Sequence, residues 1–235
     1  MTIWQRIGEI AGRISKAAPI GTIIDRIAEL LPSFASPEAR RRVAFSVAMI
    51  ALSAKMAKAD GVVAQSEINA FRQLFEVPQG EEANVARLFA MAQQDVAGFD
   101  VYARRIARLY PDEHEIFGDI VDGLFEIAKA DGVVHEYELG FLHQVAGIFG
   151  IGEAEFEIIL ARHVGLGAGD PYRVLGVARD VSDGELRRHY RRLAAENHPD
   201  KLIARGVPEE FLRIANDRLA AINAAYDQIA RERGL

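Results

Sequence analysis

The chain of 235 residues contains no cysteine, which excludes disulfide scaffolds, thiolate zinc sites and cysteine nucleophiles. Proline is scarce, at 8 residues, and aromatic residues make up only 8%. Alanine, the strongest helix former, is abundant. These proportions predict an all-α protein, and the absence of cysteine fits the reducing cytoplasm.

A long apolar run is also missing. Near the N-terminus the longest stretch without charge covers residues 17–24, whereas a membrane-spanning helix needs about 20 apolar residues. We therefore expect no transmembrane span and a cytoplasmic protein. Residues 1–37 are expected to form an amphipathic arm that docks on its own domain, with peripheral contact at the inner face of the membrane as the alternative. Apolar residues recur in this arm at helical spacing: Trp4, Ile7, Ile10 and Ile14.

An excess of basic charge is absent as well, because the net charge is -6, which excludes a generically basic nucleic-acid-binding protein. A glycine-rich stretch, residues 165–169, predicts a flexible linker between residues 38–164 and residues 170–235. Its spacing does not fit a phosphate-binding loop. Residues 1–169 carry 16 basic and 23 acidic side chains, and the remainder carries 12 and 11. We expect few contacts across the linker and separate unfolding of the two parts.

The first part contains an internal repeat. The heptapeptide Ala-Lys-Ala-Asp-Gly-Val-Val occupies residues 57–63 and again residues 128–134. Each copy predicts a helix that ends at Asp-Gly, a turn in which glycine adopts the left-handed conformation, and a second helix. Between the copies, residues 81–91 and 99–109 are expected to be helical. The pattern predicts a duplicated helical domain.

Each copy carries a carboxylate pair at the same spacing, Asp60 with Glu67 and Asp131 with Glu138. These four residues are candidate ligands of a divalent cation, calcium or magnesium, although they do not follow the EF-hand pattern. The alternative is that each Asp caps its turn and each Glu lies in the first turn of the next helix, where the helix dipole favours an acid. The histidines of this part are expected to be ordinary surface residues: His114, His135, His143 and His163.

Residues 43–164, with their two Lys-Ala-Asp-Gly-Val-Val turns followed by acids, resemble the TerB-like domain of tellurite-resistance proteins. The resemblance implies an all-helical, duplicated domain that binds a metal or a partner and has no catalytic activity.

The last part predicts two amphipathic helices. Ser182 and Glu185 form a capping box at the start of the first, which we expect to run to about Glu196 with an apolar stripe and a basic face. A second stripe follows at helical spacing, and the two helices are expected to pack as an antiparallel hairpin. The basic face consists of four arginines: Arg187, Arg188, Arg191 and Arg192.

The tripeptide His198-Pro199-Asp200 lies between these helices. We expect residues 197–207 to be irregular, because proline fixes its own φ angle and disfavours the helical conformation of the residue before it. The stretch would then present an imidazole and a carboxylate to solvent.

With the opening segment of residues 170–177 and the Ala-Ala-Tyr at residues 224–226, this part resembles the J-domain. The resemblance implies stimulation of ATP hydrolysis by a DnaK-type chaperone. In it, His198, Pro199 and Asp200 form the essential loop, and the four arginines form the docking face. A TerB-like domain followed by a J-domain resembles the DjlA co-chaperone family, although the better-known members of that family have an N-terminal membrane span.

Other functions fit the residues less well. His198 and Asp200 could act as a general acid and base, but no nucleophile accompanies them, so we expect no enzyme and no required cofactor. The balanced charge of residues 170–235 argues against nucleic-acid binding. We favour a co-chaperone whose acidic domain targets it to an unknown protein partner or to a cation. The alternative is a metal or stress sensor with the J-domain as its output.

Overall fold

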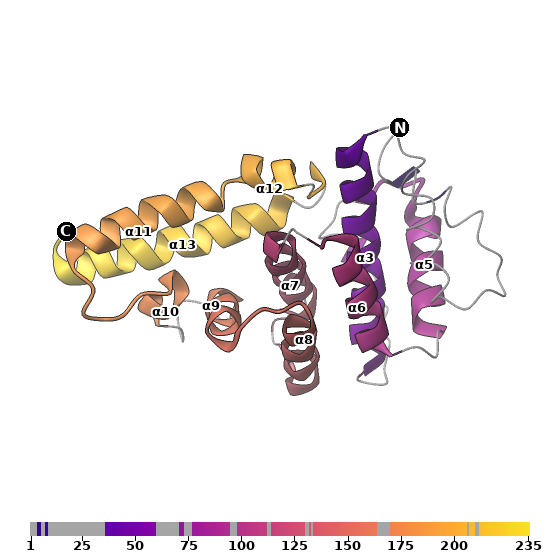
Figure 1. The fold of residues 1–235 in the computed structure, drawn as a ribbon, viewed down its shortest axis with the longest axis horizontal. Helices are drawn as coiled ribbons and strands as arrows, with labels where there is room; N and C mark the ends of the chain where they lie inside the picture. Colours follow the sequence, from indigo (N-terminus) through magenta and orange to yellow (C-terminus); the bar gives the residue numbers. More distant parts are fainter. Residues whose placement is uncertain are drawn as a thin grey trace.

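All regular structure in the described residues is helical (Figure 1). The computed structural model describes the following residues: 4, 5, 8, 36–59, 71, 72, 77–94, 98–111, 114–129, 132, 134–163, 170–205, 207–209 and 212–235. The helical structure of the described residues confirms the predicted all-α class. Most of the arm and the whole of the linker lie outside the described residues.

Six described helices precede the linker. Their bounds are α3 Pro37–Ala59, α5 Glu82–Gln94, α6 Phe99–Leu109, α7 His114–Ala128, α8 Glu136–Ile148 and α9 Glu153–His163. The expected helices at residues 81–91 and 99–109 correspond to α5 and α6. Helix α3 contacts α5, α6, α7 and α8, and its residues from Val43 to Ala57 are buried, as expected for a helix that is apolar around most of its circumference.

Helix α7 is also buried along most of its length, because it lies between α3 on one side and the last helices of the chain on the other (Figure 1). It ends at Ala128, and α8 begins at Glu136. Gly132, in the turn between them, has a φ of 104°, the left-handed conformation predicted for this glycine. The corresponding first turn lies outside the described residues, so the duplication remains a prediction.

Four helices follow the linker, with bounds α10 Pro171–Leu175, α11 Asp183–Glu196, α12 Pro199–Arg205 and α13 Leu212–Arg233. Asp170 caps α10 by accepting a hydrogen bond from the backbone N–H of Tyr172 at 3.1 Å. The capping box of Ser182 and Glu185 is present at the start of α11. Helix α11 ends at Glu196, as predicted.

The expectation of an irregular stretch over residues 197–207 was wrong, because α12 forms within it. Pro199 is the first residue of α12, a position where its missing N–H costs no hydrogen bond. Leu202 of this helix is fully buried among residues of the first part. Burial against a distant segment therefore stabilises a short helix that local sequence does not reveal.

Helices α11 and α13 pack side by side as the predicted hairpin (Figure 1). The rings of Tyr190 and Tyr226 stack with centroids 4.0 Å apart, and the Tyr190 hydroxyl donates to Asn223 Oδ1 at 3.0 Å. At the far end, Arg233 donates to the Tyr172 hydroxyl at 3.0 Å and to Asp183 at 3.1 Å. These contacts close the last part of the chain around α10.

The two parts pack closely, which contradicts the expectation of few contacts across the linker. Four residues that follow the linker belong to the buried core of the first part: Leu202, Val207, Ile214 and Ala215. Gly123 of α7 permits a close approach, because a Cβ there would lie 2.7 Å from Met49 Cε and 2.9 Å from Ile214 Cδ1. Arg173 of α10 also forms an ion pair with Glu157 of α9. A shared core predicts a single unfolding unit.

Trp4 of the N-terminal arm is buried in the same core as α3, in agreement with docking of the arm at this residue. No helix among the described ranges has both the length and the apolar character to cross a membrane.

Candidate functional site

The tripeptide at residues 198–200 lies where α11 ends and α12 begins. The His198 and Asp200 side chains are 54% and 85% exposed. The backbone N–H of Asp200 donates to His198 Nδ1 at 3.3 Å, and the same ring nitrogen lies 3.5 Å from Asp200 Oδ2. The imidazole and the carboxylate therefore face solvent together, as predicted, although Pro199 and Asp200 belong to a helix.

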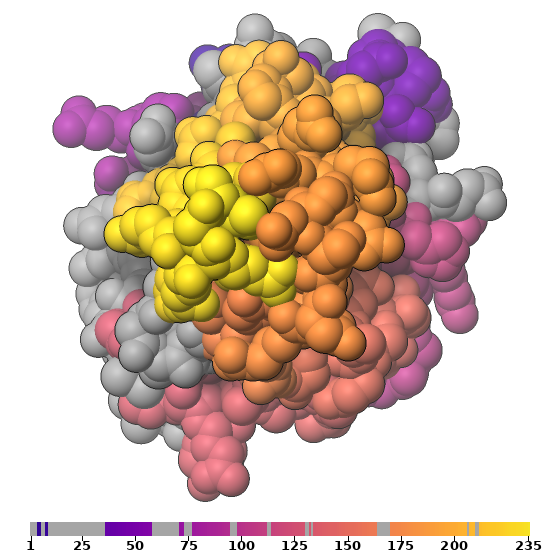
Figure 2. All heavy atoms as spheres, turned by 90° about the vertical axis from the view of Figure 1, so that its left-hand side faces the viewer, coloured from indigo at the N-terminus to yellow at the C-terminus, as the bar shows by residue number. Residues whose placement is uncertain are grey.

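The four arginines of α11 are all exposed, whereas Leu186, on the face toward α13, is fully buried. Figure 2 shows α11 and α13 on the outer face of the molecule. Arg192 donates to His189 Nδ1 at 3.0 Å, and His189 Nε2 donates to the Leu175 carbonyl at 2.7 Å. The basic face is open to solvent, and the helix that carries it ends at Glu196, two residues before His198.

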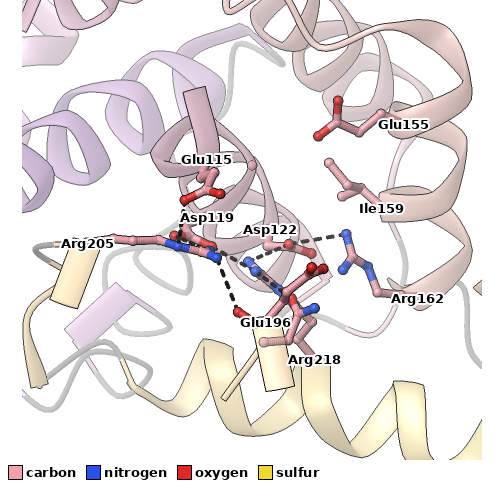
Figure 3. Close-up of a pocket in the computed structure, with 11 residues that line it drawn as sticks. Glu115, Asp119, Asp122, Glu155, Ile159, Arg162, Glu196, Arg205 and Arg218 are labelled. Carbon is pink, nitrogen blue, oxygen red and sulfur yellow. Dashed lines mark hydrogen bonds and ion pairs between the residues drawn. The ribbon is translucent and has the colours of Figure 1, made fainter. Parts of the chain in front are cut away.

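Charged residues of α7, α9, α12 and α13 gather at the boundary between the two parts of the chain (Figure 3). Asp119 and Asp122 of α7 are each 1% exposed. Arg218 Nη1 donates to Asp119 Oδ1 at 2.7 Å, and its Nη2 lies 2.6 Å from Asp122 Oδ2. Arg162 and Arg205 approach the same carboxylates at 3.5 and 3.6 Å. A cavity of about 240 Å³ opens beside these residues.

The pKa values of the acids in this cluster are shifted in opposite directions. Burial raises the pKa of Asp119, because Arg218 and Arg205 only partly offset the loss of solvation. Burial acts in the same direction on Asp122, but Arg162, Arg218 and His163 outweigh it and hold the pKa of Asp122 far below its usual range. Burial is likewise outweighed at Glu126, where His163 and Lys129 lower the pKa.

The sequence analysis missed this cluster, although a signal was present. Arg218 lies on the apolar stripe of α13, three residues after Ala215 and four before Ile222. Asp119 and Asp122 likewise interrupt an apolar helix. A charged residue in an apolar stripe must be paired if it is buried, so the pattern indicated a buried ion pair but not its partner.

His163 also differs from its prediction as a surface residue. Its side chain is 6% exposed and its Nε2 lies 2.7 Å from Asp122 Oδ1. The ring stacks on Phe125 with centroids 4.8 Å apart. His114, His135 and His143 are exposed, as predicted. Burial between two acids therefore makes His163 part of the ion cluster.

The candidate cation ligands are only partly described, since Asp60, Glu67 and Asp131 lie outside the described residues. Glu138 is buried at the start of α8, where its Oε2 accepts a hydrogen bond from the His135 backbone N–H at 2.8 Å. Glu138 thus lies in the first turn of the next helix, as the alternative to cation binding predicts. The described part of the chain holds no cluster of three or more potential metal ligands.

Two families match the chain in succession. Residues 46–161 match the family described as tellurite resistance protein TerB, and residues 170–233 match the DnaJ domain. No solved structure gives a significant match.

Several curated relatives are named co-chaperone protein DjlA. The one from Photobacterium profundum is 28% identical over 83% of this chain and 79% of its own length. The one from Photorhabdus laumondii is 28% identical over 86% and 83%, and the one from Shewanella oneidensis is 34% identical over 47% of each chain. With a TerB domain followed by a DnaJ domain, the chain belongs to the DjlA-type, DnaJ-like co-chaperones.

Proposed function

We propose that the chain stimulates ATP hydrolysis by a DnaK-type chaperone, with His198, Pro199 and Asp200 as the trigger and the α11 arginines as the docking face. One observation supports this most strongly: His198, Asp200 and the four arginines are exposed while the J-domain is packed against the TerB domain. The chaperone can therefore reach them without separation of the domains.

The two groups have different roles in this proposal. Arg187, Arg188, Arg191 and Arg192 form a positive surface that attracts and orients an acidic partner. His198 and Asp200 offer an imidazole and an ionised carboxylate, which form directional, charge-assisted hydrogen bonds at the contact. The arginines therefore determine how readily the complex with the chaperone forms, and the tripeptide determines whether the bound chaperone hydrolyses ATP faster.

The test is the His198→Gln variant of the full chain in a DnaK ATPase assay. His143→Gln is the matched control, because His143 is also exposed, at 52%, but lies on α8 of the TerB domain. We expect His198→Gln to abolish stimulation and His143→Gln to retain it. Equal stimulation by both variants, with unchanged circular dichroism, would contradict the proposal.

For the TerB domain we propose a targeting role, through an unknown protein partner or a divalent cation. The excess of acid in residues 1–169 supports this proposal, since acidic surfaces attract basic partners and cations. It predicts that Asp60→Asn combined with Asp131→Asn weakens binding of calcium or magnesium without unfolding the protein. If the wild-type chain binds neither ion at about 1 mM, a concentration at which weak calcium sites fill, the cation alternative is rejected and protein targeting remains.

A further inference from the structure

Two buried or half-buried arginines hold the residues that directly precede His198. Arg218 of α13 donates from Nη1 to Asn197 Oδ1 at 3.1 Å. Arg205 of α12 donates from Nη2 to the Glu196 carbonyl at 3.2 Å. The donors and acceptors of these two bonds all lie in residues 170–235. Together the two bonds hold Glu196, the last residue of α11 (Figure 3), and Asn197, its cap.

One TerB residue, Asp119, contacts both arginines, which also pair singly with other acids of α7: Arg218 with Asp122 at 2.6 Å and Arg205 with Glu115 at 3.1 Å. Asp119 Oδ1 accepts a hydrogen bond from Arg218 at 2.7 Å, and Asp119 Oδ2 lies 3.6 Å from Arg205 Nη1. Asp119 is 1% exposed, so these interactions are little screened by solvent. A continuous path of contacts therefore runs from α7 of the TerB domain to the residue before His198.

Asn197 is held both by local bonds and by Arg218. Its backbone N–H donates to the Leu193 carbonyl at 3.0 Å, and its side-chain Nδ2 donates to the same oxygen at 2.7 Å. Its Oδ1 is held by Arg218. Because a guanidinium donates in a fixed, planar geometry, the position of Arg218 helps to determine where the Asn197 side chain lies, and Asp119 orients the nitrogen of Arg218 that makes this bond.

We propose that Asp119 is a positioning residue for the trigger, a role that rests on the proposed function. By holding Arg205 and Arg218, it fixes the end of α11 and thus the direction in which His198 and Asp200 leave the fold. Asp119 is 1% exposed, so it acts through these arginines rather than by touching the chaperone. The arginine face of α11 does not depend on it.

The test separates positioning from binding with Asp119→Asn in the full chain. Asparagine keeps the size and one acceptor oxygen but loses the charge that holds two guanidinium groups. We expect the maximal stimulated rate of a DnaK-type ATPase to fall about tenfold, because displacement of a reacting group by ~1 Å can cost about 100-fold. The concentration for half-maximal stimulation should change less than about twofold, since electrostatic docking is separate from the trigger.

Glu126→Gln is the matched control. Glu126 lies on the same helix and is similarly buried, but it pairs with Lys129 and His163 rather than with Arg205 or Arg218. It should leave the maximal rate unchanged. An equal loss in both variants would show that general damage to the TerB domain is responsible and would overturn the proposal, as would an unchanged or a higher maximal rate for Asp119→Asn.

A second variant and the resonances of the His198 ring test the same role of Asp119. If Asp119→Asn does not fold, Arg205→Gln replaces it, because the Arg205 side chain is 20% exposed and the same loss of maximal rate is expected. Nuclear magnetic resonance of the His198 ring should show a shift in Asp119→Asn and none in Glu126→Gln. A wild-type chain without stimulation would reject the proposed function, and the His198 resonances alone would then decide whether Asp119 positions the tripeptide.

Discussion

The J-domain uses arginine in two opposite environments. Arg187, Arg188, Arg191 and Arg192 are exposed along α11, whereas the Arg218 side chain is 5% exposed between two aspartates of the TerB domain. An exposed ion pair contributes only about 0–1 kcal/mol. Removal of one partner from a buried pair costs about 3–5 kcal/mol. The same residue type therefore provides an exposed basic surface in one place and a buried contact between the domains in the other.

The difference teaches how the two domains are connected. The glycine-rich linker suggests independent halves, but Arg218 and the apolar residues around Ile214 join them. Helix α7 provides the TerB side of both contacts, since Gly123 faces Ile214 and Asp119 and Asp122 face Arg218. The domain boundary in sequence is thus not a boundary in the packing.

The largest expected effect separates these two environments directly. Arg218→Met should lower the free energy of unfolding of the full chain by about 3–5 kcal/mol, because Asp119 and Asp122 lose a buried counter-charge. Arg187→Met, on the exposed face, should change it by no more than about 0.5 kcal/mol. Urea unfolding measures both. Similar losses in the two variants would contradict the distinction between the environments.

A smaller effect should depend on pH. The pKa of Asp122 is lower in the folded chain than its ordinary value of 3.8, so the folded state binds fewer protons there than the unfolded chain. The stability that the ionised group contributes is present above about pH 4 and is lost progressively as the pH falls below that value. The difference in free energy of unfolding between wild type and Asp122→Asn should therefore be largest near pH 7 and shrink toward pH 3.

That prediction is measured by urea unfolding at a series of pH values. A difference between wild type and Asp122→Asn that stays constant from pH 7 to pH 3 would show that Asp122 does not titrate with the fold. Burial raises the pKa of the neighbouring Asp119, so it contributes a pH dependence of opposite sign. Asp119 is present in both proteins, so only the part of its pKa shift that the Asp122 charge causes, a minor one, enters the comparison.

Local signals were sufficient to predict several elements. The capping box of Ser182 and Glu185, the end of α11 at Glu196 and the positive φ of Gly132 depend on neighbouring residues, and each was found where expected. These features could be predicted because the interactions that determine them span only a few residues. His198 and Asp200 are exposed as expected, although the irregular stretch from which their exposure was inferred contains α12.

Contacts between distant segments were not predictable from the sequence. Helix α12 depends on burial of Leu202 in the TerB core, and the pairing of Arg218 with Asp119 joins residues 99 positions apart. His163 appeared to be a surface residue because nothing near it in sequence shows that Asp122 lies beside it. The sequence shows which charged residues interrupt an apolar stripe, but only the fold shows which of them meet.

The most direct test of the central claim is the rate of ATP hydrolysis by a DnaK-type chaperone, measured against the concentration of the full chain at low and at high salt. Arg191→Ala combined with Arg192→Ala should need a higher concentration but reach the wild-type maximal rate, and its deficit should shrink as salt screens the docking charges. His198→Gln should give no stimulation at any concentration or salt. Stimulation by folded His198→Gln at the wild-type maximal rate would show that this tripeptide is not the trigger.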